Sequence, residues 1–303
     1  MRIALIADIH GNIHALEAAL DDLQRQHVDR VIVNGDFANR GADTLAVYQR
    51  IAPLLSDATL GNHDDLMVIW NAPRDPARYD WLDDRFWAGG AQAAARLAPT
   101  GALDQIRALP MTVRVELDDA PSLLISHGSP RHYREGYGRD VTPELISEIV
   151  DEYPADVLVG SHTHRPMLKS WSRYTVMNTG AIGASFTGDA RAHYLILTAR
   201  AGEWAPEFRR VPYDVDAAIA SYDANGLIDE LAASGELEEH LLDMYVFREE
   251  LKHARSFLVP YMMWAEVEGL PKSMASWELF RARHQERFAP PSRPNEIRSS
   301  SEP

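Results

Sequence analysis

Cysteine is absent from the 303-residue chain. Without thiols, disulfide scaffolds, thiolate zinc sites and cysteine nucleophiles are excluded, so any metal must be held by His, Asp, Glu or Asn. Positive charge is also scarce, because 30 Lys and Arg stand against 45 Asp and Glu, a formal net charge of −15. A surface of this sign repels a phosphate backbone, so we expect no extended nucleic-acid surface. A small anionic substrate stays compatible with this charge if metal ions supply the positive charge.

Long apolar runs are missing as well. The N-terminal run over residues 1–7 is too short for a signal peptide or a membrane span, and the carboxylate of Asp8 follows it at once. We therefore expect a cytoplasmic chain with no membrane segment. At 46% apolar residues, the chain has enough apolar side chains for one large core or two smaller ones.

Short β-branched runs alternate with amphipathic segments in the first half of the chain, which is typical of an α/β fold. A polar, Trp-rich helical stretch over residues 65–108 interrupts this alternation, and another helix begins at Thr142-Pro143. The amphipathic segments are centred on residues 13–23 and 45–55. The predicted strands are residues 2–7, 31–33, 59–60, 111–117, 122–126, 157–159, 175–177, 194–197 and 208–211.

From residue 214 onward the pattern is helical only. We therefore divide the chain into a domain over residues 1–212, a C-terminal helical extension over 213–288, and a disordered tail over 289–303 that is rich in Pro and Ser. The aromatic residues of the extension are more consistent with packing than with substrate contact. A lid over the site and a homo-oligomer interface remain alternatives for it.

Five polar blocks follow apolar runs, where the strands of an α/β fold end and such folds bind ligands. Residues i and i+2 of an extended segment point the same way, so the two ends of Asp-x-His and His-x-His can reach one cavity. Four imidazoles, two carboxylates and one amide make seven ligands for a pair of divalent ions, with one His left over. The blocks are Asp8-Ile9-His10, Gly35-Asp36, Gly61-Asn62-His63-Asp64, Ser126-His127-Gly128 and Gly160-Ser161-His162-Thr163-His164.

These blocks, in this order, resemble the signature of the calcineurin-like metallophosphoesterases. The opening segment 7–12 is similar to the bacterial and archaeal branch of small phosphodiesterases and diadenosine-tetraphosphatase-like proteins. The resemblance covers residues 1–212. It implies an α/β fold built as a two-sheet β-sandwich flanked by helices, and hydrolysis of a phosphate ester by a hydroxide that bridges two divalent metal ions.

Carried over to this sequence, the family's motif implies a role for each polar residue. His63 would protonate the leaving oxygen, although a structural hydrogen bond to its turn is the alternative. Manganese is the working choice by analogy with the family, and Fe, Zn, Co or Ni also suit mixed N and O ligands. The implied ligands are Asp8, His10 and His164 for the first ion, Asp36 as a bridge, and Asn62, His127 and His162 for the second.

Two loops carry further polar side chains. Asn39 stands where the protein-phosphatase branch has an acidic residue, and Arg40 after it either clamps a phosphate oxygen or is a solvated loop arginine. Asp64 and Asp65 are expected to cap the following helix. The loop over residues 132–139 contains His, Tyr and Arg, and it either binds a base or a phosphate or is a plain surface loop.

The leading functional hypothesis is a metal-dependent phosphoesterase that acts on a small phosphodiester or nucleotide, such as a cyclic nucleotide or a dinucleoside polyphosphate. A phosphomonoesterase, including a protein phosphatase, comes second, and Asn39 counts against the latter. The third hypothesis is a non-catalytic metal-binding scaffold that uses the C-terminal helices to bind a protein. A complete ligand set and an intact His63 count against a scaffold.

Overall fold

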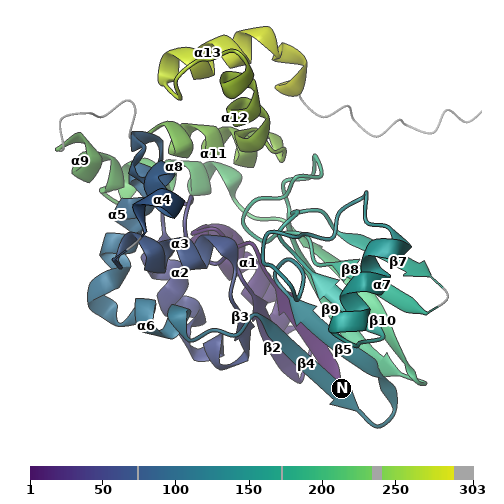
Figure 1. Ribbon diagram of the computed structural model, residues 1–303. Helices are drawn as coiled ribbons and strands as arrows, with labels where there is room; N and C mark the ends of the chain where they lie inside the picture. Colours follow the sequence, from purple (N-terminus) through teal and green to yellow (C-terminus); the bar gives the residue numbers. More distant parts are fainter. Residues whose placement is uncertain (74, 172, 234–240, 290–303) are drawn as a thin grey trace, which may run out of the picture.

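Two five-stranded mixed sheets pack face to face and are flanked by helices in the computed structural model, which describes residues 1–73, 75–171, 173–233 and 241–289 (Figure 1). The first sheet has the order β10 (Glu203–Val211), β9 (Ala192–Arg200), β1 (Arg2–Ile6), β2 (Arg30–Asn34) and β3 (Ala58–Thr59). The second has the order β4 (Thr112–Leu117), β5 (Ala120–Ser126), β6 (Val157–Gly160), β8 (Tyr174–Asn178) and β7 (Met167–Trp171). In each sheet three neighbouring strands are parallel: β1, β2 and β3 in the first, and β5, β6 and β8 in the second. The predicted two-sheet α/β sandwich is confirmed.

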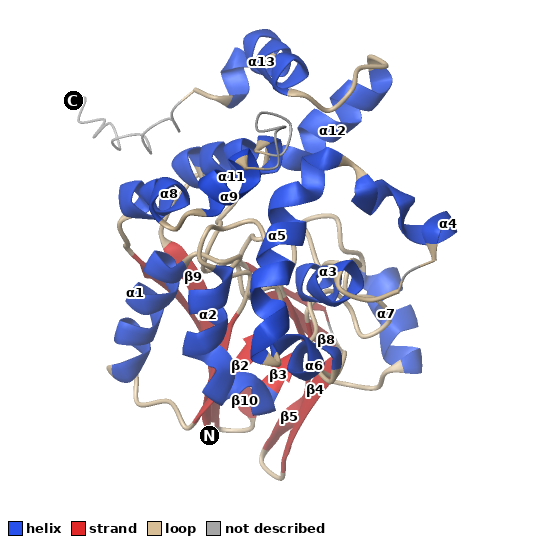
Figure 2. Ribbon diagram, turned by 90° about the vertical axis from the view of Figure 1, so that its left-hand side faces the viewer, coloured by secondary structure: helices blue, strands red, loops and turns tan. Residues whose placement is uncertain are grey.

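Helices cover the outer faces of both sheets and the end of the sandwich at which the parallel strands terminate (Figure 2). Asn12 caps the first helix, because its Oδ1 accepts a hydrogen bond from the amide of Ala15 at 3.0 Å. The α-helices are α1 (Ile13–Gln24), α2 (Thr44–Ile51), α3 (Asn62–Trp70), α4 (Pro76–Tyr79), α5 (Ala88–Leu97), α6 (Ala102–Arg107), α7 (Pro143–Glu152), α8 (Val215–Ala224), α9 (Leu227–Ala232), α11 (Leu242–His253), α12 (Leu258–Val267) and α13 (Met274–Arg283). The 3₁₀ segments are η1 (Ala52–Asp57), η2 (Asp80–Asp83), η3 (Arg85–Trp87), η4 (Ala98–Thr100) and η5 (Gln285–Arg287).

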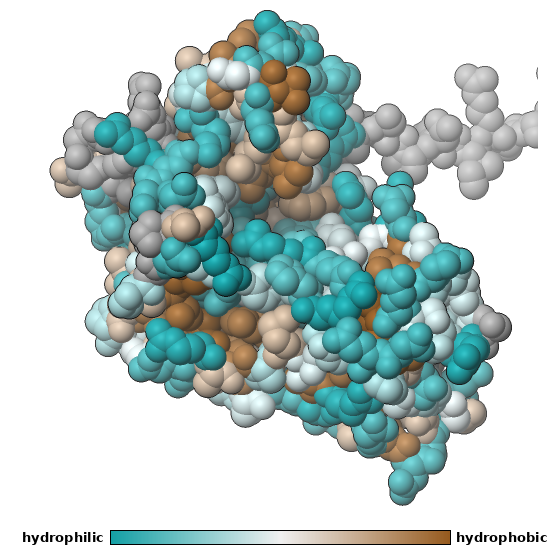
Figure 3. Space-filling view, viewed as in Figure 1, coloured by the Kyte–Doolittle hydropathy of each residue, from teal (hydrophilic) through white to brown (hydrophobic). Residues whose placement is uncertain are grey.

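The C-terminal helices form a layer above the sandwich, and the surface beneath α12 is hollowed and largely hydrophilic (Figures 1 and 3). One apolar cluster joins α8 and α11 to Ala42 and Ala184, which belong to loops of the sandwich. A second cluster joins α11, α12 and α13 to η3. The domain boundary at residue 212 stays a prediction, and residues 290–303 of the proposed tail lie outside the described residues. In the described part, no helix is long and apolar enough to cross a membrane.

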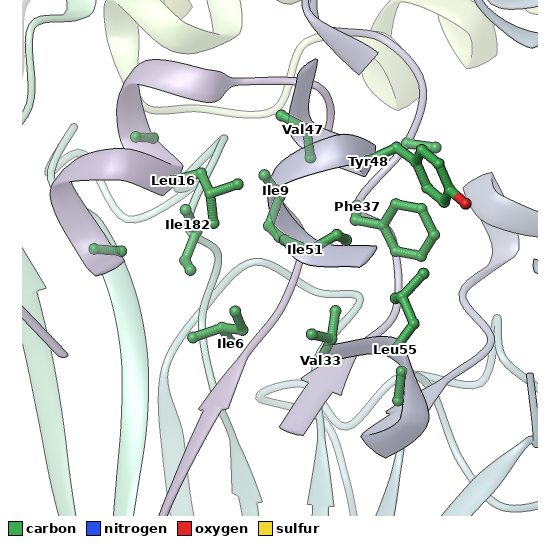
Figure 4. Close-up of a cluster of buried hydrophobic side chains, with 14 of the residues drawn as sticks. Ile6, Ile9, Leu16, Val33, Phe37, Val47, Tyr48, Ile51, Leu55 and Ile182 are labelled. Atoms are coloured by element: carbon green, nitrogen blue, oxygen red, sulfur yellow. The ribbon is translucent and has the colours of Figure 1, made fainter. Parts of the chain in front are cut away.

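Successive side chains of the central strands point alternately into two separate hydrophobic cores. Ile3 and Leu5 of β1 face the second sheet, whereas Ala4 and Ile6 face the helices, because successive side chains of a strand point to opposite sides. The helix-facing core is drawn in Figure 4, where Phe37 packs beside α2. This packing holds the loops after β1 and β2 against the helices that follow them.

Two elements differ from the prediction. The edge strand β7 is absent from it, because its alternation of half-buried and exposed side chains covers only five residues and includes Lys169. The helix expected from residue 65 begins at Asn62, which places His63 in the first turn of α3. The remaining stretch to residue 107 is broken into short helices and 3₁₀ segments instead of a continuous helix.

Candidate metal centre

The polar blocks meet at the carboxyl ends of the parallel strands. Backbone hydrogen bonds join the loops that follow these strands: the amide of Asp8 donates to Gly35 O at 3.1 Å, and the amide of Ser161 donates to His127 O at 2.7 Å. Gly61 has no room for a side chain, since an added Cβ would lie 2.1 Å from Oδ1 of Asp36. The loops are therefore packed closely around one point between the two sheets.

Backbone strain is concentrated at this point. Ten residues other than glycine have a positive φ in the described part of the chain, and seven of them belong to the polar blocks or to the loop after β2. Such conformations are costly and are held in place only by their surroundings, and they cluster at functional sites. The seven residues are Asp8, His10, Asp36, Asn39, Arg40, His162 and His164.

Six of the proposed ligands come together in two sets of three. Asp8, His10 and His164 present ligand atoms within 4.8 Å of one another, and so do Asp36, His127 and His162. In the first set the two Nε2 atoms of the imidazoles are 3.1 Å apart, and in the second the His127 Nε2 lies 3.1 Å from Oδ2 of Asp36. His10 and Asp36 also form a set with His63, a combination that the sequence analysis did not suggest. The first set has the three members that the family resemblance implied for the first ion, and the second joins the implied bridge Asp36 to His127 and His162. Their roles as metal ligands stay predictions.

The donor atoms fit divalent metal ions. Oδ1 of Asp8, Oδ1 of Asn62 and Nε2 of His127 are buried and have no hydrogen-bond partner among the described residues. Unpaired buried polar atoms are costly, and a cation removes that cost. Nδ1 of His127 is 2.9 Å from Asn34 O, and Nδ1 of His164 is 2.5 Å from Ala184 O. Because each Nδ1–H donates to a carbonyl, each Nε2 keeps its lone pair for a metal.

The pKa values in the cluster diverge strongly. Burial opposes charging of His127, but the carboxylates of Asp36 and Asp8 outweigh it and raise its pKa to about 10. Burial lowers the pKa of His63 to about 3 and that of His162 to about 4. Carboxylates and imidazoles this close together need positive charge between them, which metal ions supply in place of protons.

His63 is held in one tautomer by Asn39. The Asn39 Oδ1 accepts a hydrogen bond from the amide of Arg40 at 2.7 Å, so its Nδ2 is the end that faces Nδ1 of His63 at 3.0 Å. An amide nitrogen can only donate, so Nδ1 of His63 accepts and Nε2 carries the proton of the neutral ring. Asn39 stands where the protein-phosphatase branch has an acidic residue. Its amide keeps a proton on Nε2 of His63 while the imidazole stays neutral.

Asp64 fastens the loop after β2 to the start of α3. Its carboxylate accepts hydrogen bonds from the amides of Gly61, Asp36 and Ala38, at 3.2, 2.7 and 3.0 Å. The bond to Gly61 is the expected cap, and the other two are additional. Asp65 accepts a hydrogen bond from the Tyr133 hydroxyl at 2.7 Å.

The structure corrects the expectation for Arg40. The residue is 7% exposed, so the solvated-loop alternative is wrong. Its Nη1 is 2.6 Å from Oε2 of Glu250 and its Nη2 is 3.0 Å from Oδ1 of Asp243, both on α11, and the guanidinium lies over the Phe247 ring at 4.5 Å. The guanidinium is thus taken up by two buried carboxylates, which leaves phosphate binding by Arg40 without support.

Aromatic rings close one side of the centre. Phe186 stacks on the imidazole of His164 with ring centroids 4.3 Å apart, and Phe247 lies 6.0 Å from the ring of His10. His63 and His162 are only half-buried, so the centre is open on their side.

Sequence reasoning missed these rings and the acids on α11. A signal was present, because Asp243, Phe247 and Glu250 lie at i, i+4 and i+7 and so share one helix face. Two carboxylates on an otherwise apolar face need a buried cation as their partner.

Asp36→Asn is expected to lower the occupancy of both metal ions together. Asp36 belongs to the second set and lies beside the first, with Oδ2 3.1 Å from Nε2 of His127 and 3.9 Å from Nε2 of His10. An amide keeps the shape but loses the negative charge and one acceptor oxygen. Metal analysis of the purified variant measures this. Loss of one ion with full retention of the other would contradict a bridging role.

The fold and the donor set together define a His/Asp metal centre between the two sheets of an α/β sandwich. The family model described as calcineurin-like phosphoesterase matches residues 1–166. The match spans more than half of the chain, so the chain belongs to this family. Membership indicates a hydrolase of phosphate esters that uses divalent metal ions.

Two solved structures and one protein sequence are similar to this chain. A metallophosphoesterase from Sphaerobacter thermophilus is 24% identical, with a TM-score of 0.59, and the match covers 76% of this chain and 97% of that one. Hypothetical protein PH1004 from Pyrococcus horikoshii is 19% identical, with a TM-score of 0.64, covering 84% and 99%. The uncharacterized protein MJ0912 of Methanocaldococcus jannaschii is 23% identical over 242 residues, which are 74% of this chain and 93% of that protein. The structural matches show the fold.

Proposed function

We propose that this protein hydrolyses a small phosphodiester or nucleotide-type substrate with two divalent metal ions, and that manganese is the first metal to test. The observation that carries the proposal is the pair of three-residue ligand sets, Asp8/His10/His164 and Asp36/His127/His162, with His63 beside both. Asn62, which directly precedes His63, adds a buried oxygen with no hydrogen-bond partner among the described residues. The cytoplasmic location expected from the sequence stays a prediction.

Different residues of the centre have different roles in the proposed reaction. Two divalent ions bound here would lower the pKa of a water molecule and offset charge on the phosphate oxygens. The carboxylates of Asp36 and Asp8 would balance the positive charge of these ions. The carbonyls of Asn34 and Ala184 fix the orientation of the imidazoles of His127 and His164. The two phenylalanines exclude water from the closed side.

His63 is placed to donate a proton to the leaving oxygen. Asn39 keeps the hydrogen on Nε2, and the half-buried ring lies on the open side, where a substrate can arrive. General acids of this kind need hydrogen-bond reach to the leaving group, which a histidine in the first turn of α3 can provide.

The test is hydrolysis of bis-p-nitrophenyl phosphate and p-nitrophenyl phosphate by Mn²⁺-loaded protein, with chelator-stripped protein as the control. Metal-dependent cleavage of the diester in excess supports the proposal. A preference for the monoester would favour a phosphomonoesterase or protein phosphatase instead. Absence of both activities in protein that retains its metals would favour a non-catalytic scaffold.

A homo-oligomer through the C-terminal helices also stays a prediction. Val259, Met263 and Val267 are exposed by 58%, 63% and 86%, and they lie four residues apart on α12. Such a row of exposed apolar side chains is compatible with a contact between copies. Sedimentation equilibrium of the full chain measures the oligomeric state directly.

A further inference from the structure

The loop between β5 and α7 borders the open side of the metal centre. At Gly136 its backbone lies against the imidazole of His162, because an added Cβ would be 2.9 Å from Cδ2 of that ring. Three residues earlier, the Tyr133 hydroxyl donates a hydrogen bond at 2.7 Å to Oδ2 of Asp65, in the first turn of α3. The same turn carries His63. The segment between these two contacts therefore runs from α3 to His162, along the half-buried side of the centre.

Both ends of this segment are anchored to the sandwich. At its start, the carbonyl of Tyr133 lies so close to Gly128 that an added Cβ on the glycine would clash with it. At its end, Tyr137 is buried, and its carbonyl accepts a hydrogen bond from Nδ2 of Asn178 at 3.1 Å. The backbone of the loop is thus fixed, and the side chain of Tyr133 extends from it to α3.

Tyr133 makes the polar link between this loop and α3. Among the described residues, no other hydrogen bond or ion pair joins residues 128–139 to that helix. The acceptor is a carboxylate, so the bond is stronger than one between two neutral groups. The ring is also supported from within the loop, because His132 lies beside it with ring centroids 4.8 Å apart. The loop and the helix are therefore closed on each other at one point, which a single hydrogen bond secures.

A bridge at this position restricts what can enter. A ligand that brings a phosphate group to the centre has to reach the half-buried His63 and His162, so the organic group on its phosphorus lies beside the bridge. A narrow group fits while the bridge is closed. A wide group requires the hydrogen bond to break, and the free energy of that bond is then lost from binding.

We propose that the hydrogen bond between Tyr133 and Asp65 is a latch that selects substrates by their width at the phosphorus. The substrate class is a phosphoester whose organic group is narrow at this point, as a primary alkyl group is and a tertiary one is not. This inference rests on the proposed function, because it takes the metal centre to bind the phosphate. Tyr133 and Asp65 determine specificity and take no part in the reaction itself.

The test measures, by calorimetry, the Kd values of n-butylphosphonate and tert-butylphosphonate on Mn²⁺-loaded protein. The two isomers carry the same charge and the same number of carbon atoms, and they differ in width at the phosphorus. Wild type is expected to bind the straight isomer more tightly.

Tyr133→Phe and Asp65→Ala each remove the latch. Each variant is expected to bind the branched isomer about tenfold more tightly than wild type does, the factor that one hydrogen bond to a charged group allows. The Kd of the straight isomer is expected to stay the same. Because both changes remove the same hydrogen bond, Tyr133→Phe/Asp65→Ala is expected to gain no more than either variant alone. Asp65→Asn keeps an oxygen that can accept from Tyr133, so its gain is expected to be smaller than that of Asp65→Ala.

The matched control is Tyr174→Phe, which removes a hydroxyl at the end of β8 away from the centre. This hydroxyl makes no hydrogen bond within the described ranges, and the variant is expected to equal wild type with both isomers. The latch is overturned if its removal leaves the affinity for the branched isomer unchanged, or if the affinities for both isomers change equally, as loss of a purely structural contact would cause. Binding of neither isomer by protein that holds its metals overturns it as well.

The outcomes separate this inference from the proposed function. If bis-p-nitrophenyl phosphate is cleaved and the latch variants bind both isomers as wild type does, the function stands and the latch is wrong. If the latch variants gain affinity for the branched isomer alone while no ester is cleaved, the latch stands and the hydrolytic function is wrong.

Discussion

Arg40→Ala is expected to lower the free energy of unfolding by about 3–5 kcal/mol, because it leaves two buried carboxylates without their counter-charge. Asp243 and Glu250 are 3% and 0% exposed, and Arg40 is their partner on the loop after β2. Glu250 also accepts hydrogen bonds from the amides of Phe257 and Leu258, so it cannot move to water without breaking the turn between α11 and α12. Urea unfolding of wild type and variant measures the difference.

The control for this experiment is Arg107→Ala, which breaks the ion pair with Asp104. Those side chains are 55% and 85% exposed, and an exposed pair contributes at most about 1 kcal/mol. Arg40→Lys keeps the charge but not the forked geometry, so it is expected to fall between wild type and Arg40→Ala. An Arg40→Ala variant as stable as Arg107→Ala would show that the buried ion cluster does not hold α11 to the loop.

His63→Ala is expected to reduce hydrolysis of the preferred ester by a factor on the order of 10² to 10⁴, the usual contribution of a general acid. Metal content is expected to stay at the wild-type level, because the two main ligand sets do not include His63. Steady-state kinetics and metal analysis on the same preparation measure both quantities.

His14→Ala provides the matched control, since His14 lies on α1 outside all the ligand sets that the described residues form. Its activity is expected to equal that of wild type. If His63→Ala were as active as His14→Ala, proton donation by His63 would be wrong. If it lost its metals instead, His63 would be a ligand, as the set with His10 and Asp36 allows.

Sequence patterns predicted the strands and the α/β alternation because periodicity reports burial directly, whereas the two-sheet sandwich was implied by the family resemblance. The strand over residues 2–7 reads as apolar throughout, since β1 is central and its two faces meet different cores. The polar blocks were recognisable because each follows such a strand, so their convergence required only that parallel strands end at one edge. Even so, the roles of the individual ligands stay predictions until metal binding is measured.

The contacts between distant segments could not be predicted in this way. Asp243 and Glu250 lie more than 200 residues from Arg40, and no local pattern states which loop a helix will cover. Charge pairing across such distances is set by the tertiary fold.

The C-terminal extension is therefore part of the centre's framework. The ion cluster of Arg40, Asp243 and Glu250 joins α11 to the loop that carries Asp36 and Asn39, and Phe247 of α11 covers His10. A lid would have to separate these buried charges each time it opened. We infer that α11 stays in place while substrate enters past His63 and His162.

The most direct measurement is a titration of chelator-stripped protein with Mn²⁺, with bound metal and hydrolysis of bis-p-nitrophenyl phosphate followed together. Two ligand sets, one of which contains Asp36 and the other of which lies beside it, predict that two ions bind per chain and that activity rises to its maximum only at the second equivalent. Full activity at one equivalent, or the same activity without metal, would contradict a two-ion centre.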